Sequence, residues 1–225
     1  MTGASGVRLA LFDLDHTLLE GDSDLEWGEL LAERGLADAA QVRRFLEQYH
    51  AGTLVIEELL RFQIEPLARH PMDSLEAWRA EFLERRIRPR LTGRELVARH
   101  AAAGHELALV TATNRFLAEP IAAELAIPHL IATEPERRDG RFTGRWLEPP
   151  CFREGKLAAL ERWLAARGLA WQDVKESWFY SDSHNDLPLL SRVTHPVAVH
   201  PDPELAEHAG RSGWPVMDLS QPPAE

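Results

Sequence analysis

The sequence is poor in cysteine and contains no long uninterrupted apolar segment. Its single cysteine, Cys151, cannot form a disulfide within the chain, which is typical of a protein from a reducing compartment. No segment has the roughly 18 consecutive apolar residues of a membrane-spanning helix. The apolar run Val7–Phe12 is interrupted by Arg8 and is too short for a signal peptide. These absences favour a soluble, cytoplasmic protein.

An excess of positive charge is also missing. The 225 residues carry a formal net charge of −11, and basic clusters such as Arg85–Arg88 are short, so nucleic acid is not expected as a partner. An acidic protein that handles phosphate must neutralise it locally. We therefore expect a metal ion and a lysine or arginine at any phosphate site. The oligomeric state cannot be predicted from these features.

Short apolar strands alternate with helical patterns over most of the chain. Strands are predicted at residues 9–12, 106–110, 131–132, 177–180 and 197–199. Helices are predicted at residues 92–103, 115–125 and 154–167, and Asp139-Gly140 is typical of a hairpin turn. This alternation predicts an α/β fold with a doubly wound, mainly parallel, Rossmann-like sheet that helices cover on both faces.

Residues 24–88 have helical spacing alone. Leu25, Leu30 and Leu31 begin a series of apolar residues at helical intervals, and Gly35, Pro66 and Pro71 are predicted breaks between roughly four short helices. The chain is therefore predicted to contain an α/β core domain, residues 1–23 and 89–225, into which a helical domain of residues 24–88 is inserted.

Polar residues follow three of the predicted strands at their carboxyl ends. Asp13, Thr111 and Asp182 should meet there, because open α/β sheets place ligand sites outside the carboxyl ends of their strands. Asp13 could attack phosphorus and form an acyl phosphate. Asp15 could protonate the leaving oxygen and then deprotonate the attacking water. We predict a phosphoryl-transfer site at this edge.

Several further residues complete the predicted site. A cluster of carboxylates suits Mg²⁺. Asp182 is better placed than Asp186 to bind the metal, and Asp186 could bind it either directly or through a water. Thr111 offers a hydroxyl to a phosphoryl oxygen, and from Ala112 onward the backbone turns into a helix whose N–H groups favour anions. Lys156 can offset negative charge in the transition state.

Each element alone has an ordinary structural explanation. An Asp-x-Asp pair is commonly a turn, a threonine after a strand commonly caps a helix, and a lysine in a first helical turn is commonly solvated. Residues 182–186 could be a helix N-terminus capped by Ser183 and Asn185. Four such elements in this order are hard to explain that way, and we interpret them as one phosphate site.

The combination resembles the haloacid dehalogenase-like superfamily, and within it the phosphoserine-phosphatase-like group with a helical cap. Its four motifs match Asp13–Thr17, Leu109–Thr111, Lys156 and Asp182–Asp186, the last through Asn185. The resemblance covers nearly the whole chain. It implies that Asp13 is the nucleophile and a Mg²⁺ ligand, that Asp15 is the acid/base and binds metal through its backbone carbonyl, and that Asp182 is a ligand. It also implies that the helical domain is a cap that closes over the substrate.

The residues expected to contact the substrate differ from those at the same positions of the phosphoserine phosphatases. Those enzymes have a glutamate where this chain has Asp22, and a cap arginine near Gln63, with Arg61 two residues earlier. Residues two apart on a helix point in different directions, so Arg61 is not a direct replacement. Asp22, Arg61, Gln63 and Asn185 remain candidate substrate contacts. The ordinary explanations are a helix N-cap for Asp22 and a surface charge for Arg61.

Three functions are consistent with these residues. The first is a Mg²⁺-dependent phosphatase of a small phosphomonoester, with phosphoserine or histidinol phosphate as candidates; the latter has an amine and no carboxylate. The second is a phosphotransferase that passes the phosphoryl group to an acceptor other than water. The third is a receiver-like signalling domain, which the order of elements disfavours because receivers phosphorylate an Asp on a middle strand and lack a helical insert.

Overall fold

A six-stranded parallel sheet forms the centre of the molecule. The computed structural model describes residues 6–51 and 53–219, so the ends of the predicted core domain lie outside it. The strand order is β3-β2-β1-β6-β7-β8. The strands are β1 (Val7–Phe12), β2 (Glu106–Asn114), β3 (His129–Thr133), β6 (Val174–Ser181), β7 (His195–Val199) and β8 (Val216–Met217). The predicted α/β fold is confirmed, and each of the five predicted strands is present.

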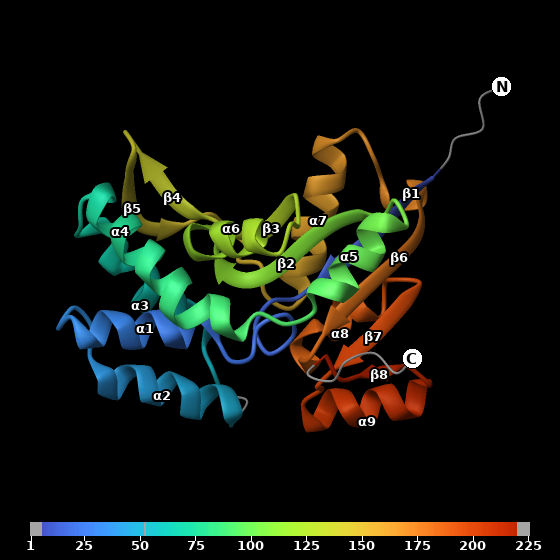
Figure 1. Ribbon diagram of the computed structural model, residues 1–225, viewed down its shortest axis with the longest axis horizontal. Coiled ribbons are helices and arrows are strands. Elements are labelled where there is room, and N and C mark those ends of the chain that lie inside the picture. The colour runs from blue at the N-terminus through green and yellow to red at the C-terminus, as the bar shows by residue number, and fades with distance from the viewer. Residues whose placement is uncertain (1–5, 52, 220–225) are drawn as a thin grey trace.

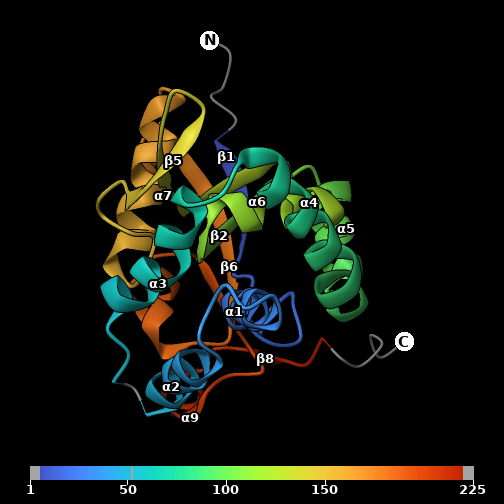
Figure 2. The ribbon, with the colours of Figure 1, turned by 90° about the vertical axis from the view of Figure 1, so that its left-hand side faces the viewer.

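Strand β1 is apolar throughout its second half because helices cover both faces of the sheet (Figure 2). Leu9 and Leu11 face one apolar cluster, which includes residues of α7 (Glu154–Ala166), α8 (Leu187–Leu190) and α9 (Pro203–Ser212). Ala10 and Phe12 face the opposite cluster, with α5 (Arg94–Ala102) and α6 (Arg115–Glu124). Alternate side chains of a strand point to opposite faces, so a strand buried on both is continuously apolar.

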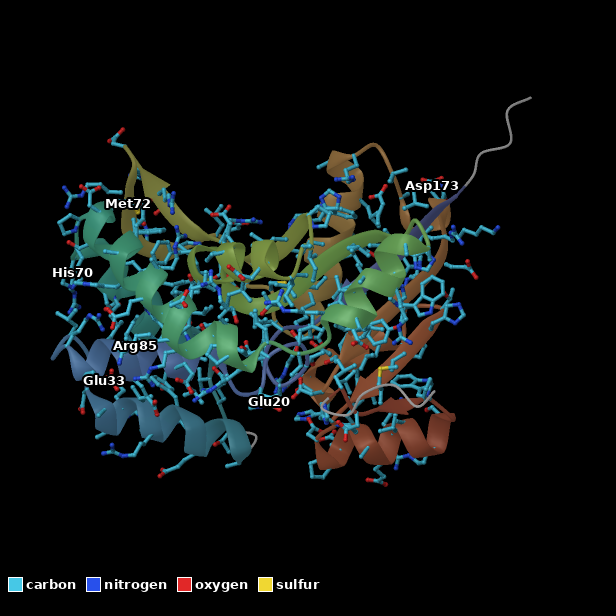
Figure 3. The ribbon with its side chains drawn as sticks, viewed as in Figure 1. Glu20, Glu33, His70, Met72, Arg85 and Asp173 are labelled. Carbon is cyan, nitrogen blue, oxygen red and sulfur yellow. The ribbon has the colours of Figure 1, made fainter. Side chains whose placement is uncertain are left out.

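A helical insert joins β1 to α5 and lies at one end of the sheet (Figure 1). It contains α1 (Ser23–Glu33), α2 (Ala39–His50), α3 (Ile56–Ala68), α4 (Met72–Phe82), the π-helix Leu83–Ile87 and the 3₁₀ helix Arg88–Arg90. Four α-helices were expected here. Pro66 was predicted to be a break between helices. It lies instead within the last turn of α3. Figure 3 labels His70 and Met72 at the tip of the insert, and Asp173 at the opposite end of the core.

Aromatic side chains connect the insert to the core. Trp27 of α1 contacts Phe82 of α4 edge-on at 5.4 Å between ring centroids, and Phe116 of α6 at 6.2 Å. Phe116 in turn contacts Phe142 at 5.3 Å. All four side chains are buried in the apolar cluster that also contains Phe12. The insert therefore packs against the core through a shared cluster of buried side chains.

A hairpin supports the insert from a second side. Strands β4 (Pro135–Arg138) and β5 (Arg141–Trp146) are antiparallel, and the predicted turn Asp139-Gly140 has positive φ at both residues, as tight hairpin turns require. Gly144 of β5 faces α3: a Cβ there would lie 3.5 Å from Ala68. The hairpin thus fixes the position of α3 relative to the core.

Candidate active site

One buried lysine joins two carboxylates at the carboxyl edge of the sheet. Asp13 directly follows β1, and its N–H continues the strand pairing by donating to the Tyr180 carbonyl at 2.9 Å. The ammonium of Lys156, in the first turn of α7, donates to Asp13 Oδ1 and to Asp186 Oδ2, both at 2.7 Å. Ser181 also donates to Asp186 Oδ2, at 2.7 Å. Asp13, Lys156 and Asp186 are all buried.

Burial and charge oppose each other in this group. Burial raises the pKa of Asp13, and the adjacent Lys156 partly offsets that rise. Burial also raises the pKa of Asp186, to about 6, against the same lysine. Burial alone would lower the pKa of Lys156, but the two carboxylates raise it above its ordinary range. The lysine is therefore a permanent cation that stabilises the ionised form of Asp13.

Asp15 is held by two donors from different parts of the chain. Its Oδ1 accepts from the Ser23 N–H at 2.6 Å, and its Oδ2 accepts from the Thr113 hydroxyl at 2.7 Å. The Ser23 and Thr113 hydroxyls are themselves 3.0 Å apart. Burial raises the pKa of Asp15 to about 6, and the charge of Asp22 adds to this. A carboxyl with such a pKa can both donate and accept a proton near neutral pH.

Thr113 and Ser23 were not among the predicted site residues. Strand β2 was expected to end at Thr111, but it continues to Asn114, whose side chain caps α6 by accepting from the Leu117 N–H at 3.3 Å. The longer strand brings Thr113 beside Asp15. The run Thr111-Ala112-Thr113-Asn114 contained the only sequence signal, because Asn114 is a better helix cap than either threonine.

Asp182 follows β6 and faces the same pocket. Its Oδ1 accepts from the Thr17 hydroxyl at 3.2 Å. Burial raises its pKa well above the ordinary value, and the charges of Asp13 and Asp186 raise it further. Among the described residues that line the pocket, six are aspartates and Lys156 is the one cation. Carboxyl groups therefore far outnumber cationic groups in the described lining of this pocket.

This donor set fits a hard divalent cation. Across residues 6–51 and 53–219, no three His, Cys, Asp or Glu side chains form a ready-made metal site. Both carboxylate oxygens of Asp15 are occupied by Ser23 and Thr113. Asp13 and Asp182 remain as carboxylate donors, and Mg²⁺ commonly binds one or two carboxylates while keeping several waters. A cation would also relieve the repulsion that raises the pKa of Asp182.

The predicted phosphate contacts in the core line the same pocket of about 70 Å³. Thr111 is buried, and its Oγ1 accepts from the Thr113 N–H at 3.1 Å, which leaves its hydroxyl proton for a phosphoryl oxygen. Ala112 and Asn185 also line the pocket. The Asn185 side chain accepts from Arg153 Nε at 2.8 Å and donates to the Ser183 hydroxyl at 3.1 Å. Ser183 caps the 3₁₀ helix His184–Asp186, so this segment has both a structural and a site role.

The candidate substrate contacts of the insert separate into two groups. Asp22 caps α1, accepting from the N–H groups of Asp24 and Leu25 at 2.9 Å, and also lines the pocket. Arg61 is not brought to this pocket: it is exposed, lies 3.8 Å from Glu65, and lines a separate cavity of about 550 Å³ between α2 and α3. Gln63, two residues on, faces inward and is buried, as the opposite phase on a helix requires.

The single cysteine of the chain, Cys151, lies close to the active site without being suited to act as its nucleophile. Cys151 is buried beside the site, and burial raises the pKa of its thiol to about 12, which makes it a poor nucleophile.

None of the described helices is long and apolar enough to cross a membrane.

Sequence comparisons with known proteins show which family the chain belongs to. Residues 10–191 match the sequence model of the haloacid dehalogenase-like hydrolases, and the chain belongs to this family. A histidinol-phosphatase of Neisseria meningitidis serogroup C (strain 8013) is 42% identical over 219 residues, which cover 94% of this chain and 99% of that one. The phosphoserine phosphatase SerB1 of Mycobacterium tuberculosis (strain ATCC 25618 / H37Rv) is 32% identical over 219 residues, covering 93% and 70%. The chain is an enzyme of the phosphoric monoester hydrolase class.

Solved structures share the fold of this chain. A crystal structure of a protein of unknown function from Bordetella pertussis Tohama I has a TM-score of 0.89 and 50% identity, covering 96% of this chain and 100% of that one. A phospho-aspartyl intermediate analogue of phosphoserine phosphatase has a TM-score of 0.68 at 20% identity, covering 96% and 95%. At that identity the likeness concerns the fold.

Proposed function

We propose that this protein hydrolyses histidinol phosphate, with Mg²⁺ and through an aspartyl-phosphate on Asp13. The observation that carries the chemistry is the contact between Asp13 and Lys156, a carboxylate at a strand end held at 2.7 Å by a buried ammonium. The choice of histidinol phosphate is supported by the Neisseria relative, which is named a histidinol-phosphatase and is 42% identical over nearly the full length of both chains.

The first half-reaction transfers the phosphoryl group to Asp13. Because Oδ1 of Asp13 accepts from Lys156, Oδ2 is left to attack phosphorus. As the bond from Oδ2 to phosphorus forms, the bond from phosphorus to the alcohol oxygen breaks, and protonated Asp15 gives its proton to that oxygen. Thr111 donates a hydrogen bond to a phosphoryl oxygen, and the charge of Lys156 offsets negative charge in the transition state.

The second half-reaction returns the enzyme to its starting state. Asp15, now ionised, takes a proton from a water as that water attacks phosphorus. The acyl phosphate bond breaks, inorganic phosphate leaves, and Asp13 is again a carboxylate beside Lys156. Ser23 and Thr113 hold Asp15 in one orientation through both proton transfers.

The metal would be held by the carboxylates of Asp13 and Asp182 and by the backbone carbonyl of Asp15. When bound, Mg²⁺ supplies positive charge that allows a phosphate dianion to enter a pocket rich in carboxylates. Asp186 shares Oδ2 with Lys156 and Ser181, which favours contact through a water over direct binding.

The helical insert acts in this proposal as the cap of the core domain formed by residues 1–23 and 89–225. Leu54, Ile56 and Leu59 of the insert give the pocket of the catalytic carboxylates an apolar wall. Such a wall limits water at the reacting phosphorus. Water remains the acceptor in this account, whereas a phosphotransferase would admit an alcohol in its place.

A substrate panel tests the proposal. Purified protein is assayed with histidinol phosphate, phosphoserine and an aryl phosphate, with Mg²⁺ and with excess EDTA. The expected result is a kcat/KM for histidinol phosphate well above the other two, loss of turnover with EDTA, and one phosphate released per alcohol formed. A kcat/KM no higher than for the aryl phosphate would contradict the substrate. A phosphate deficit when alcohols are added would favour phosphotransfer.

A further inference from the structure

Two buried polar side chains of the insert, Asp24 and Gln63, have atoms without a hydrogen-bond partner among the described residues, and the proposed chemistry does not use either side chain. Asp24, in the first turn of α1, lines the active-site pocket, is 8% exposed, and has no hydrogen-bond partner for Oδ1. Gln63 of α3 is 1% exposed, and neither its amide oxygen nor its amide nitrogen has a partner. Buried polar groups are paired in the great majority of cases, so each exception needs an explanation.

The two side chains lie beside each other. Burial raises the pKa of Asp24 well above its ordinary value, the charges of Asp22 and Asp15 raise it further, and the nearby Gln63 amide lowers it. The Gln63 amide lies close enough to the Asp24 carboxyl to lower its pKa by hydrogen bonding, although no well-formed hydrogen bond reaches Asp24 Oδ1 within the described chain. Buried polar groups without well-formed hydrogen bonds destabilise a fold, so a purely structural role does not explain why both side chains are polar.

The charge on this side of the pocket selects the kind of ligand. The lining residues from the described part of the insert and its entry loop include Asp22 and Asp24 but no lysine, arginine or histidine. Arg61, a candidate substrate contact from the sequence, lines the separate cavity between α2 and α3 instead. A substrate carboxylate would therefore be repelled here, whereas a cation would be attracted.

We propose that Asp24, positioned by the adjacent Gln63, binds the cationic nitrogen group of the substrate, and so selects phosphomonoesters of alcohols that carry a cation and no carboxylate. Asp24 accepts a hydrogen bond from the ammonium or protonated ring nitrogen, and the amide nitrogen of Gln63 donates to the same carboxylate and holds it in place. The apolar side chains Leu54, Ile56 and Leu59 cover the carbon skeleton. The proposal rests on the proposed phosphatase function and identifies the residues that set its specificity.

The test compares variants on substrates that differ in charge. Asp24→Asn and Gln63→Leu are assayed with histidinol phosphate, phosphoethanolamine, phosphoserine and an uncharged aryl ester. Asp73→Asn, an exposed carboxylate of α4, is the matched control. Asp24→Asn should lower kcat/KM for the two cationic substrates by roughly 30-fold more than for the aryl ester, mainly through KM, because it removes one partner of a buried charge pair.

Gln63→Leu separates a binding role from a structural one. It should raise the melting temperature, because an unpaired buried amide is replaced by an apolar side chain of similar size. It should also lower kcat/KM for the cationic substrates by about tenfold relative to the aryl ester, the worth of one hydrogen bond to a charged group. A structural residue would instead lose stability and leave the substrate preference unchanged.

The outcomes distinguish this proposal from the preceding one. A preference for phosphoethanolamine over histidinol phosphate would support the cation site and contradict the named substrate. Equal losses on cationic and uncharged substrates in Asp24→Asn would overturn the cation site while leaving histidinol phosphate as the substrate. A wild-type preference for phosphoserine would contradict both.

Discussion

The ammonium of Lys156 donates a hydrogen bond to Asp13 across 2.7 Å, although the two residues lie 143 positions apart in the chain. The contact forms because β1 is an inner strand and α7 begins at the same edge of the sheet. It is the closest approach of a cation to the proposed nucleophile within the described pocket.

Replacing Lys156 by methionine should lower kcat by roughly 10²–10³-fold, because a fixed charge at the transferring phosphoryl group is lost. It should also destabilise the protein by about 3–5 kcal/mol, since Asp13 and Asp186 would be left buried without their counter-charge. Steady-state kinetics with an aryl phosphate and urea unfolding measure the two effects. Lys175→Met, at an exposed position, is the control. A Lys156→Met enzyme whose kcat stays within about threefold of wild type would contradict the role.

Thr113 should set the pKa of Asp15 without touching the substrate. Its hydroxyl donates to the carboxylate, and hydrogen bonds to the ionised form lower a carboxyl pKa. In Thr113→Val the pKa of Asp15 should rise by roughly one unit, because the ionised carboxylate loses the stabilisation of one hydrogen bond. The alkaline limb of the kcat/KM profile should move to higher pH by the same amount. Thr113→Ser should restore the wild-type profile; an unshifted limb in the valine variant would refute this role.

His100 should make stability depend on pH below neutrality. Its ring accepts or donates at 2.7 Å to both Tyr180 and His105, and burial, with the charges of His105 and Arg99, lowers its pKa from 6.5 to about 4. Between these values the unfolded chain binds a proton that the native ring does not, so stability should fall as pH drops from 6.5 toward 4. The expected loss is roughly 1–3 kcal/mol.

A His100→Gln variant isolates that contribution. Its free energy of unfolding, measured by urea at pH 7 and pH 4.5, should change less between the two conditions than that of the wild type. The same pH dependence in both proteins would assign the acid sensitivity to other groups.

The insert should be stabilised through Trp27. Because Trp27 is 1% exposed and contacts both Phe82 and Phe116, Trp27→Ala should cost about 3–5 kcal/mol. Leu147→Ala, at a side chain that is 56% exposed, should change stability by less than about 0.5 kcal/mol. Loss of activity in Trp27→Ala without loss of stability would show that the insert is not packed onto the core as described.

The strand ends could be predicted because local patterns determine them. Asp13, Thr111 and Asp182 follow apolar runs, and parallel strands bring such ends together regardless of which helices intervene. Lys156 was found by its place in the first turn of α7. Strand β8 was missed because Val216–Met217 is only two residues long and pairs only through its neighbour β7.

The substrate side of the pocket could not be predicted in the same way. The phase of α3, which turns Gln63 inward and Arg61 outward, depends on its packing against β5, a contact remote in sequence. Asp24 lies two residues after Asp22 in the first turn of a helix, where an acidic residue is ordinarily explained by the helix dipole. Its burial appears only once α1 and α3 are placed together.

The most direct test of the account is to trap the phosphorylated residue. The enzyme is mixed with histidinol phosphate and Mg²⁺, quenched in acid during turnover, and reduced with borohydride, which converts an aspartyl-phosphate to homoserine. Peptide mass spectrometry should find homoserine at position 13 and unmodified aspartate at positions 15 and 182. Homoserine at another aspartate, or its absence from position 13 while phosphate is being released, would contradict the account.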